Sequence, residues 1–162
     1  MKSKAIFIST LTGFVAPIIV AFIYNFNKIP PLPLPEKKIE ISIKSHYNHQ
    51  LVNEKETITV EAKNIHDGQK IWIVVHPHES LLYFPNICSA SIDVTNRMWT
   101  SPDTPIGDNS DSGKKFDVYA LLTDYHTQNS LNLYAINPES AGLSSLPSGM
   151  YAKITVIRKR QP

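Results

Sequence analysis

The sequence has little cysteine, little glycine and no strong charge of either sign. Cys88 is the single cysteine among 162 residues, which excludes an internal disulfide and leaves the fold to rest on an apolar core. The six glycines include no Gly-x-Gly arrangement, so the glycine-rich loops that cradle phosphates are excluded. The formal net charge is +2, and basic residues form no long run apart from Arg158-Lys159-Arg160. The sequence therefore predicts no nucleic-acid partner.

An uncharged apolar segment lies close to the N-terminus, from Ala5 to Phe26, just after Lys2 and Lys4. A helix rises about 1.5 Å per residue, so about 20 residues cover the hydrocarbon core of a bilayer. We therefore predict that residues 1–27 contain a single transmembrane helix that holds the protein in the lipid bilayer. The alternative is a cleaved secretory signal, whose apolar region is shorter and ends at a site of small residues. This segment ends in bulky residues instead.

Four prolines follow within residues 28–38 and disfavour both helix and sheet. Such a composition favours polyproline II, so we predict a stiff spacer before the domain, with an SH3 or WW ligand as the alternative. Lysines flank the apolar segment on both sides, and the charges nearest to it lie on its N-terminal side. The positive-inside rule then predicts a single-pass membrane protein with an extracytoplasmic domain, periplasmic or extracellular, and leaves the cytoplasmic orientation as the alternative.

Apolar and polar residues alternate through much of the remaining chain, residues 39–162. A period of two recurs at Ile39–Ile43, Ile58–Ala62 and Phe116–Leu122, which indicates strands with one buried face. The segment Lys70–His76 is apolar on both alternations, so it predicts a central strand covered on both faces, with Trp72 in the core. Further strands are predicted at Leu81–Phe84, within Ser89–Val94 or Arg97–Thr100, and around Ala152–Val156.

Turns and one helix separate these strands. Residues 102–115 are dense in turn-forming residues. Asp124 can cap a helix that runs to about Tyr134, with Tyr125, Leu131 and Tyr134 on its apolar side. About seven short strands with one short helix predict a mostly β fold, an antiparallel immunoglobulin-like β-sandwich, for residues 39–162.

Several motifs in the same region resemble poorly characterised bacterial sandwich domains, some of which are joined to a transmembrane helix. The motifs are Ile71–Val75 (IWIVV), Phe84-Pro85, Trp99, Ile106-Gly107, Gly113 before Phe116, and Leu146-Pro147-x-Gly149. The resemblance implies a membrane-anchored immunoglobulin-like sandwich that binds or senses, without catalytic residues. It assigns no site to particular residues.

The sequence HPHE at residues 76–79 is the best candidate for a site. Residues two apart on an extended chain point to one side, so two histidines here could share a metal ion. No third ligand is specified by spacing, and we predict no bound metal. We predict instead that His76, His78, Tyr83 and Phe84 contribute to a binding surface, with a metal-dependent hydrolase as the lesser alternative.

Other patterns that carry chemistry are incomplete. Asp108–Gly113 alternates oxygen side chains as a calcium loop does, but its twelfth position is Tyr119 in place of a bidentate glutamate. The chain has no Gly-x-Ser-x-Gly elbow, and no local feature activates the thiol of Cys88. We therefore predict no enzymatic activity and no cofactor.

These observations together predict a membrane-tethered, non-enzymatic module that binds or senses a protein partner. Irregular connections on a rigid sheet commonly carry binding, so the predicted contact surfaces are the His76–Phe84 segment and the Pro102–Gly113 loop. The alternative is an accessory structural subunit of a larger membrane complex. Its helix would pack along Ala5, Ser9 and Gly13, because small residues four apart allow close helix approach.

Overall fold

The computed structural model describes residues 37–86, 91–93, 97–137 and 142–160. The predicted membrane segment Ala5–Phe26, nearly all of the predicted spacer and Cys88 lie outside these ranges. Within the described ranges, no helix is long and apolar enough to cross a bilayer.

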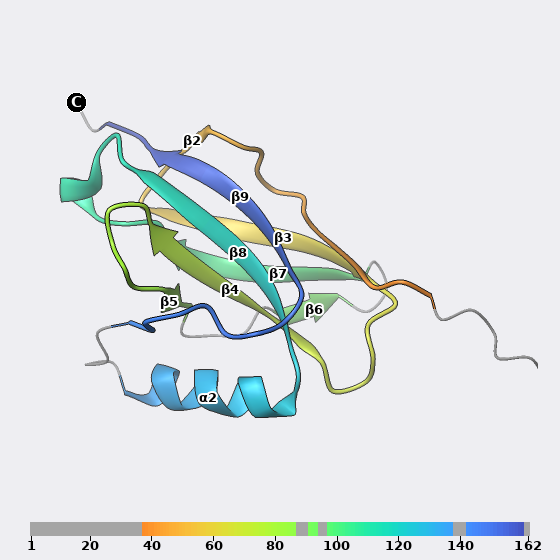
Figure 1. Cartoon of the computed structure of the whole chain (residues 1–162). Coiled ribbons are helices and arrows are strands. Elements are labelled where there is room, and N and C mark those ends of the chain that lie inside the picture. The colour runs from red at the N-terminus through yellow and green to blue at the C-terminus, as the bar shows by residue number, and fades with distance from the viewer. Residues whose placement is uncertain (1–36, 87–90, 94–96, 138–141, 161–162) are drawn as a thin grey trace, which may run out of the picture. The chain divides into compact units, whose positions relative to one another are not determined.

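Two β-sheets pack face to face as a β-sandwich (Figure 1), so the prediction of a mostly β fold is confirmed. The four-stranded sheet has the order β1 (Glu40–Ile43), β3 (Lys55–Lys63), β7 (Met98–Pro105), β6 (Ser91–Asp93). The five-stranded sheet has the order β2 (Gln50–Val52), β9 (Tyr151–Arg158), β8 (Lys115–Thr123), β4 (Lys70–Pro77), β5 (Phe84–Pro85). Neighbouring strands are antiparallel as predicted, except that β2 and β9 pair in parallel.

The main core lies between the two sheets and is built from alternate residues of the strands. Residues two apart on a strand point to the same face, which is why one alternation of each strand is buried. The cluster includes Ile58, Val60 and Ala62 of β3, Ile71, Ile73 and Val75 of β4, and Phe116, Val118, Ala120 and Leu122 of β8. The buried faces predicted for these strands are therefore confirmed.

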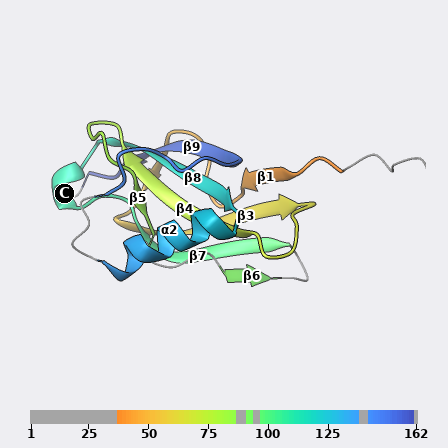
Figure 2. The ribbon, with the colours of Figure 1, turned by 60° about the horizontal axis from the view of Figure 1, so that its bottom comes forward.

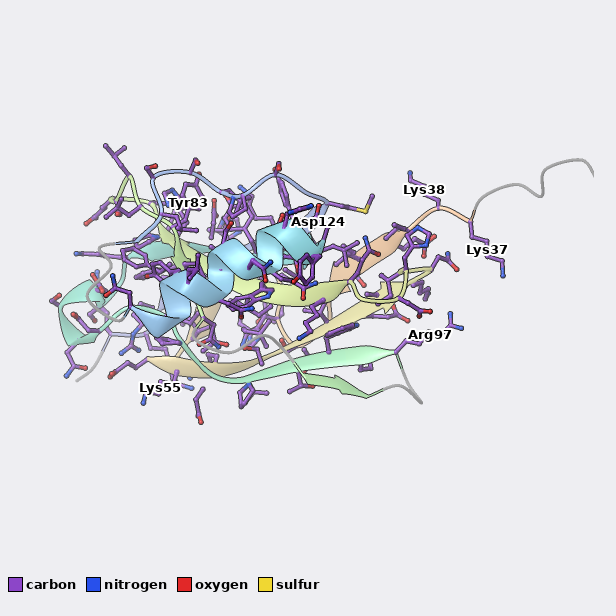
Figure 3. All side chains as sticks on the ribbon, turned by 90° about the horizontal axis from the view of Figure 1, so that it is seen from below. Lys37, Lys38, Lys55, Tyr83, Arg97 and Asp124 are labelled. Atoms are coloured by element: carbon purple, nitrogen blue, oxygen red, sulfur yellow. The ribbon has the colours of Figure 1, made fainter. Side chains whose placement is uncertain are left out.

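A second, smaller core covers the outer face of the five-stranded sheet. Trp72, Tyr119 and Leu121 belong to it and pack with Leu131 of helix α2 (Tyr125–Ile136). Figure 1 shows α2 beneath β4 and β5, and Figure 3 shows it in front of the sheets when the molecule is seen from below. Strand β4 is thus buried on both faces, as its apolar run predicts, and Trp72 is only 2% exposed.

Helix α2 begins where the sequence predicts. The Asp124 carboxylate accepts a hydrogen bond from the backbone N–H of Thr127 at 2.8 Å, which satisfies one of the free N–H groups of the first turn. The hydrogen bonds from Thr127 also lower the pKa of Asp124. Leu131 is fully buried, but Tyr125 is 72% exposed, so its predicted place on the apolar side is wrong. Leu131 is six positions after Tyr125, and this spacing places the two side chains about 120° apart around a helix.

Replacing Asp124 by alanine is expected to fray the first turn of α2, because the N–H of Thr127 loses its acceptor. Amide hydrogen exchange of the first helical turn should become faster, while the strands of both sheets keep their protection. The control is Asp124→Asn, which retains a capping oxygen. Unchanged exchange in Asp124→Ala would argue against the capping role.

Several short strands differ from their predicted limits. β5 comprises only Phe84–Pro85, and Leu81, inside the strand predicted there, is 89% exposed. Ser89–Val94 and Arg97–Thr100 were alternatives for one strand, and the structure has a strand in each: β6 lies within the first range, and β7 begins within the second. β2 was not predicted, because it has three residues and lies at a sheet edge, where the pattern of one strand is too short to read.

Strand β7 continues to Pro105, into the region predicted to be only turn. It pairs with β3 on one side along most of its length, whereas β6 pairs on the other side only with Met98–Thr100. Beyond that point no described strand pairs on the β6 side. On the β3 side, Pro102 lies at an irregularity between the pairs Ile58–Ser101 and Glu56–Thr104 and has no register partner. Proline is therefore accommodated here, as is usual at bulges and sheet edges.

Candidate functional site: a cleft at one end of the sandwich

The two segments predicted as contact surfaces meet at one end of the sandwich. The β4–β5 loop and the loop between β7 and β8 both lie there, together with the short 3-10 helix η1 (Asn109–Asp111). Figure 2 and Figure 3 show η1 at the end opposite to the one where the described chain begins, which Figure 3 marks with Lys37. This end is remote from the point at which the N-terminal segment joins the sandwich.

A cleft of about 290 Å³ lies between these two loops, and we call it the distal cleft. Its lining consists of Pro77, Glu79, Ser80 and Phe84 from the β4–β5 segment and Asp111, Lys114 and Lys115 from the segment that leads into β8. The ring of Phe84, a predicted site residue, is partly exposed here. The distal cleft therefore offers an apolar wall beside charged groups of both signs.

The loop between β7 and β8 reaches the distal cleft through a turn that requires glycine. Gly107 has a φ of +72°, and a Cβ there would lie 2.6 Å from Cζ of Phe116 and 2.7 Å from Oδ2 of Asp111. A capping box follows: Asp108 accepts a hydrogen bond from the N–H of Ser110, and Asp111 accepts one from the N–H of Asp108. These contacts stiffen the turn and fix the Asp111 carboxylate at the cleft.

Lys114 is the most heavily paired cation of the distal cleft. Its Nζ lies 3.1 Å from Oδ1 of Asp111 and 3.2 Å from Oε2 of Glu79. Hydrogen bonds to Asp111 and Glu79 raise the pKa of Lys114. Lys115 makes no ion pair and no side-chain hydrogen bond with the residues that the structure describes. Its charge is therefore the one available to a ligand.

The predicted histidines lie beside the distal cleft and have different partners. His76 stacks on Tyr83 with ring centroids 4.3 Å apart, and its Nδ1 lies 3.0 Å from the carbonyl oxygen of Leu82. Nε2 of His78 lies 2.9 Å from Oδ1 of Asp117. Across the described part of the chain, no group of three or more His, Cys, Asp or Glu side chains is placed to hold a metal ion. The contacts of His76, Tyr83 and His78 instead hold the β4–β5 loop against the sheet.

Asp117 is a buried carboxylate on the outer face of β8. Besides His78, it accepts a hydrogen bond from the Thr155 hydroxyl at 2.7 Å and pairs with Nζ of Lys153 at 3.0 Å. Burial alone would raise the pKa of Asp117, but hydrogen bonds from His78, Thr155 and Lys153 and the charge of Lys153 outweigh it and lower the pKa to about 2. The ionised carboxylate therefore links β8 to β9 and to the residue that follows β4.

Tyr119 continues the same face with aromatic contacts. Its ring centroid lies 6.0 Å from that of Tyr83, 5.3 Å from that of Tyr151, and 5.8 Å from Nζ of Lys153. Burial, followed by the negative charge of Asp117, raises the pKa of Tyr119 to about 12, so its phenol stays neutral at physiological pH. Tyr119 is only 7% exposed, and we interpret this group as the support of the cleft rather than as a binding surface.

Sequence reasoning identified one side of this region and missed the other. Lys114 and Lys115 were overlooked because they follow a turn and carry no motif. Asp117 and Tyr119 were overlooked because only the core-facing alternation of β8 was considered. Their signal was present in that alternation, since residues between two buried neighbours on a strand point to the opposite face.

Comparisons with known proteins found no relative of this chain. No protein-family model matches the chain, and neither a curated protein nor a solved structure shows significant similarity to it. The role of the distal cleft must therefore be inferred from its own residues.

Proposed function

We propose that this chain is a membrane-tethered, non-enzymatic binding module whose protein partner docks at the distal cleft. The observation that carries the proposal is the convergence of two irregular loops on a cleft that holds an exposed aromatic ring and Lys115, a lysine that makes no ion pair with the described residues. Loops that are held on a rigid sandwich commonly carry recognition, and concave sites with a few polar groups commonly bind ligands.

Strand order supports an immunoglobulin-like arrangement of this module. In chain order, β1, β3, β4, β6, β7, β8 and β9 take the letters A to G. The two sheets then read A-B-E-D and G-F-C, which is the order of the immunoglobulin fold, and β5 extends the edge at C as an added strand does in variable-type domains. In that fold the loops gather at the two ends of the sandwich, where binding surfaces are commonly placed.

The place where the predicted anchor joins the sandwich supports docking of a partner at the distal cleft. The described part of the sandwich begins at Lys37, at the end opposite to η1 (Figure 3), so the distal cleft lies at the end of the sandwich away from the point of attachment. In the extracytoplasmic orientation that the flanking lysines favour, this partner is an envelope or extracellular protein.

Site-specific photo-crosslinking in intact cells tests the proposal. A photoreactive residue in place of Leu81, which lies in the β4–β5 loop and is 89% exposed, is expected to give one discrete protein adduct. The matched control is the same residue in place of Arg97, which Figure 3 places near the end marked by Lys37. The adduct should disappear when Lys115→Glu is added to the Leu81 variant. Equal adducts from both positions, or none from Leu81, would count against docking at the cleft.

A further inference from the structure

We propose that the distal cleft recognises the free carboxyl terminus of a polypeptide that ends in an apolar residue. The proposal rests on the proposed function and names the chemistry that the partner presents. Three properties of the cleft support it: one unpaired cation, an apolar wall, and an acceptor for an N–H group. A terminal residue carries the three complementary groups within a few bonds.

The unpaired cation is Lys115, and its surroundings select a single negative charge. Lys114 is already shared by Asp111 and Glu79, so Lys115 alone can pair with an incoming anion. A phosphate carries about −1.5 to −2 charge near neutral pH and would also face those two carboxylates. A carboxylate carries one charge and can form a charge-assisted hydrogen bond with one ammonium group. The charge balance of the cleft therefore favours a carboxylate.

The apolar wall and the acceptor fit the rest of a terminal residue. Phe84 and Pro77 line the cleft with apolar atoms, against which an aliphatic side chain can pack. Glu79 uses Oε2 for Lys114, and its side chain is 69% exposed, so the carboxylate can also accept from the last peptide N–H of the partner. At about 290 Å³, the cleft lies near the lower limit of about 300 Å³ for small-molecule pockets. It suits one side chain with its carboxylate better than a larger ligand.

The β4–β5 loop is already held in one conformation, which lowers the entropic cost of binding. The N–H of Ser80 donates to the carbonyl of Pro77 at 3.0 Å, and the N–H of Leu82 donates to Oγ of Ser80 at 3.0 Å. A further hydrogen bond joins the two sides of the cleft, in which the N–H of His78 donates to the carbonyl of Lys115 at 3.0 Å. This hydrogen bond fixes the backbone of the free lysine beside the loop.

Calorimetric titration of the full chain in detergent micelles tests this proposal with two peptides, acetyl-Ala-Ala-Leu as the free acid and as the carboxyl-terminal amide. The acid is expected to bind, and the amide to bind roughly tenfold or more weakly, because the charge-assisted contact with Lys115 is lost. Lys115→Gln should reduce the affinity for the acid to a similar extent. Lys70→Gln, which alters an exposed lysine at the other end of β4, where Lys70 pairs with Thr123, should leave it unchanged.

Equal binding of acid and amide, or full affinity in Lys115→Gln, would overturn recognition of a carboxylate. Binding of free leucine as tightly as the acid peptide would overturn recognition of a polypeptide and assign the cleft to a small amino acid. If neither peptide binds while the Leu81 crosslinks persist, this proposal fails and docking at the cleft stands. If the crosslinks are absent as well, both fail.

Discussion

Replacing Trp72 by alanine is expected to lower the free energy of unfolding by about 3–5 kcal/mol, the usual cost of removing a large buried aromatic side chain. Trp72 is 2% exposed and is the largest side chain of the small core between the five-stranded sheet and α2. Its loss would leave a cavity beneath Leu131, which joins the helix to the sheet. Because domains of this size are stable by only about 5–15 kcal/mol, such a loss is a large part of the total.

Urea denaturation followed by the fluorescence of Trp99, which remains in the main core, measures this change. The matched control is Trp72→Phe. The indole N–H of Trp72 is buried without a hydrogen-bond partner among the described residues, so phenylalanine removes an unsatisfied donor while it keeps most of the packing. We expect this variant to differ from the native protein by less than about 1.5 kcal/mol. Similar stability of Trp72→Ala and the native protein would show that α2 does not cover this face in solution.

Replacing Asp117 by asparagine is expected to lower the free energy of unfolding by about 2 kcal/mol at neutral pH. The charge on Asp117 is favoured in the folded protein, where the pKa lies at about 2 instead of 3.8. Folding therefore gains from this ionised carboxylate at every pH above 3.8. The gain decreases as the pH falls from 3.8 to about 2, because the unfolded chain takes up a proton on Asp117 in this range while the native carboxylate stays ionised, and it is lost once the native carboxylate is also protonated.

Urea denaturation of both proteins across this pH range checks the prediction. The difference between them should be full above pH 3.8 and should vanish near pH 2. Asp67→Asn, which alters an exposed aspartate of the turn before β4, is the control and should have little effect at any pH. A difference between Asp117→Asn and the native protein that does not depend on pH would mean that the amide itself fits poorly and that the charge contributes nothing.

The parts of the fold that a single strand determines could be predicted from the sequence. The burial of Val60 or Val118 follows from the alternation within its own strand, and the burial of both faces of β4 follows from its continuous apolar run. The parallel pairing of β2 with β9 could not be predicted, because it joins residues that are far apart and share no local pattern. The extension of β7 past Pro102 depends likewise on pairing with β3, where Thr104 and Pro105 lie opposite Glu56 and Lys55.

Residues of the candidate site could be predicted to lie together only where they belong to one continuous segment of the chain. His76, His78 and Phe84 lie in one short segment that runs from the end of β4 to the start of β5, so their proximity could be read from the chain. Lys115 is 36 positions after Glu79, and the two share the distal cleft because β4 and β8 are neighbours in the sheet. The contact of His78 with Asp117 depends on the same pairing. Charge complementarity of this kind arises from the register of two strands, which the sequence of either strand alone does not specify.

The parallel pairing of β2 with β9 also has a consequence for the growing chain on the ribosome. Gln50 pairs with Val156, and β9 lies between β2 and β8 in the sheet. Until residues 151–158 have left the exit tunnel, β2 has no partner, and the outward edge of β8 remains unpaired. Such an exposed strand edge can pair with other chains and so favours aggregation. The five-stranded sheet can therefore be completed only after β9 has been synthesised. A nascent chain that stalls before Tyr151 would need a chaperone to protect that edge.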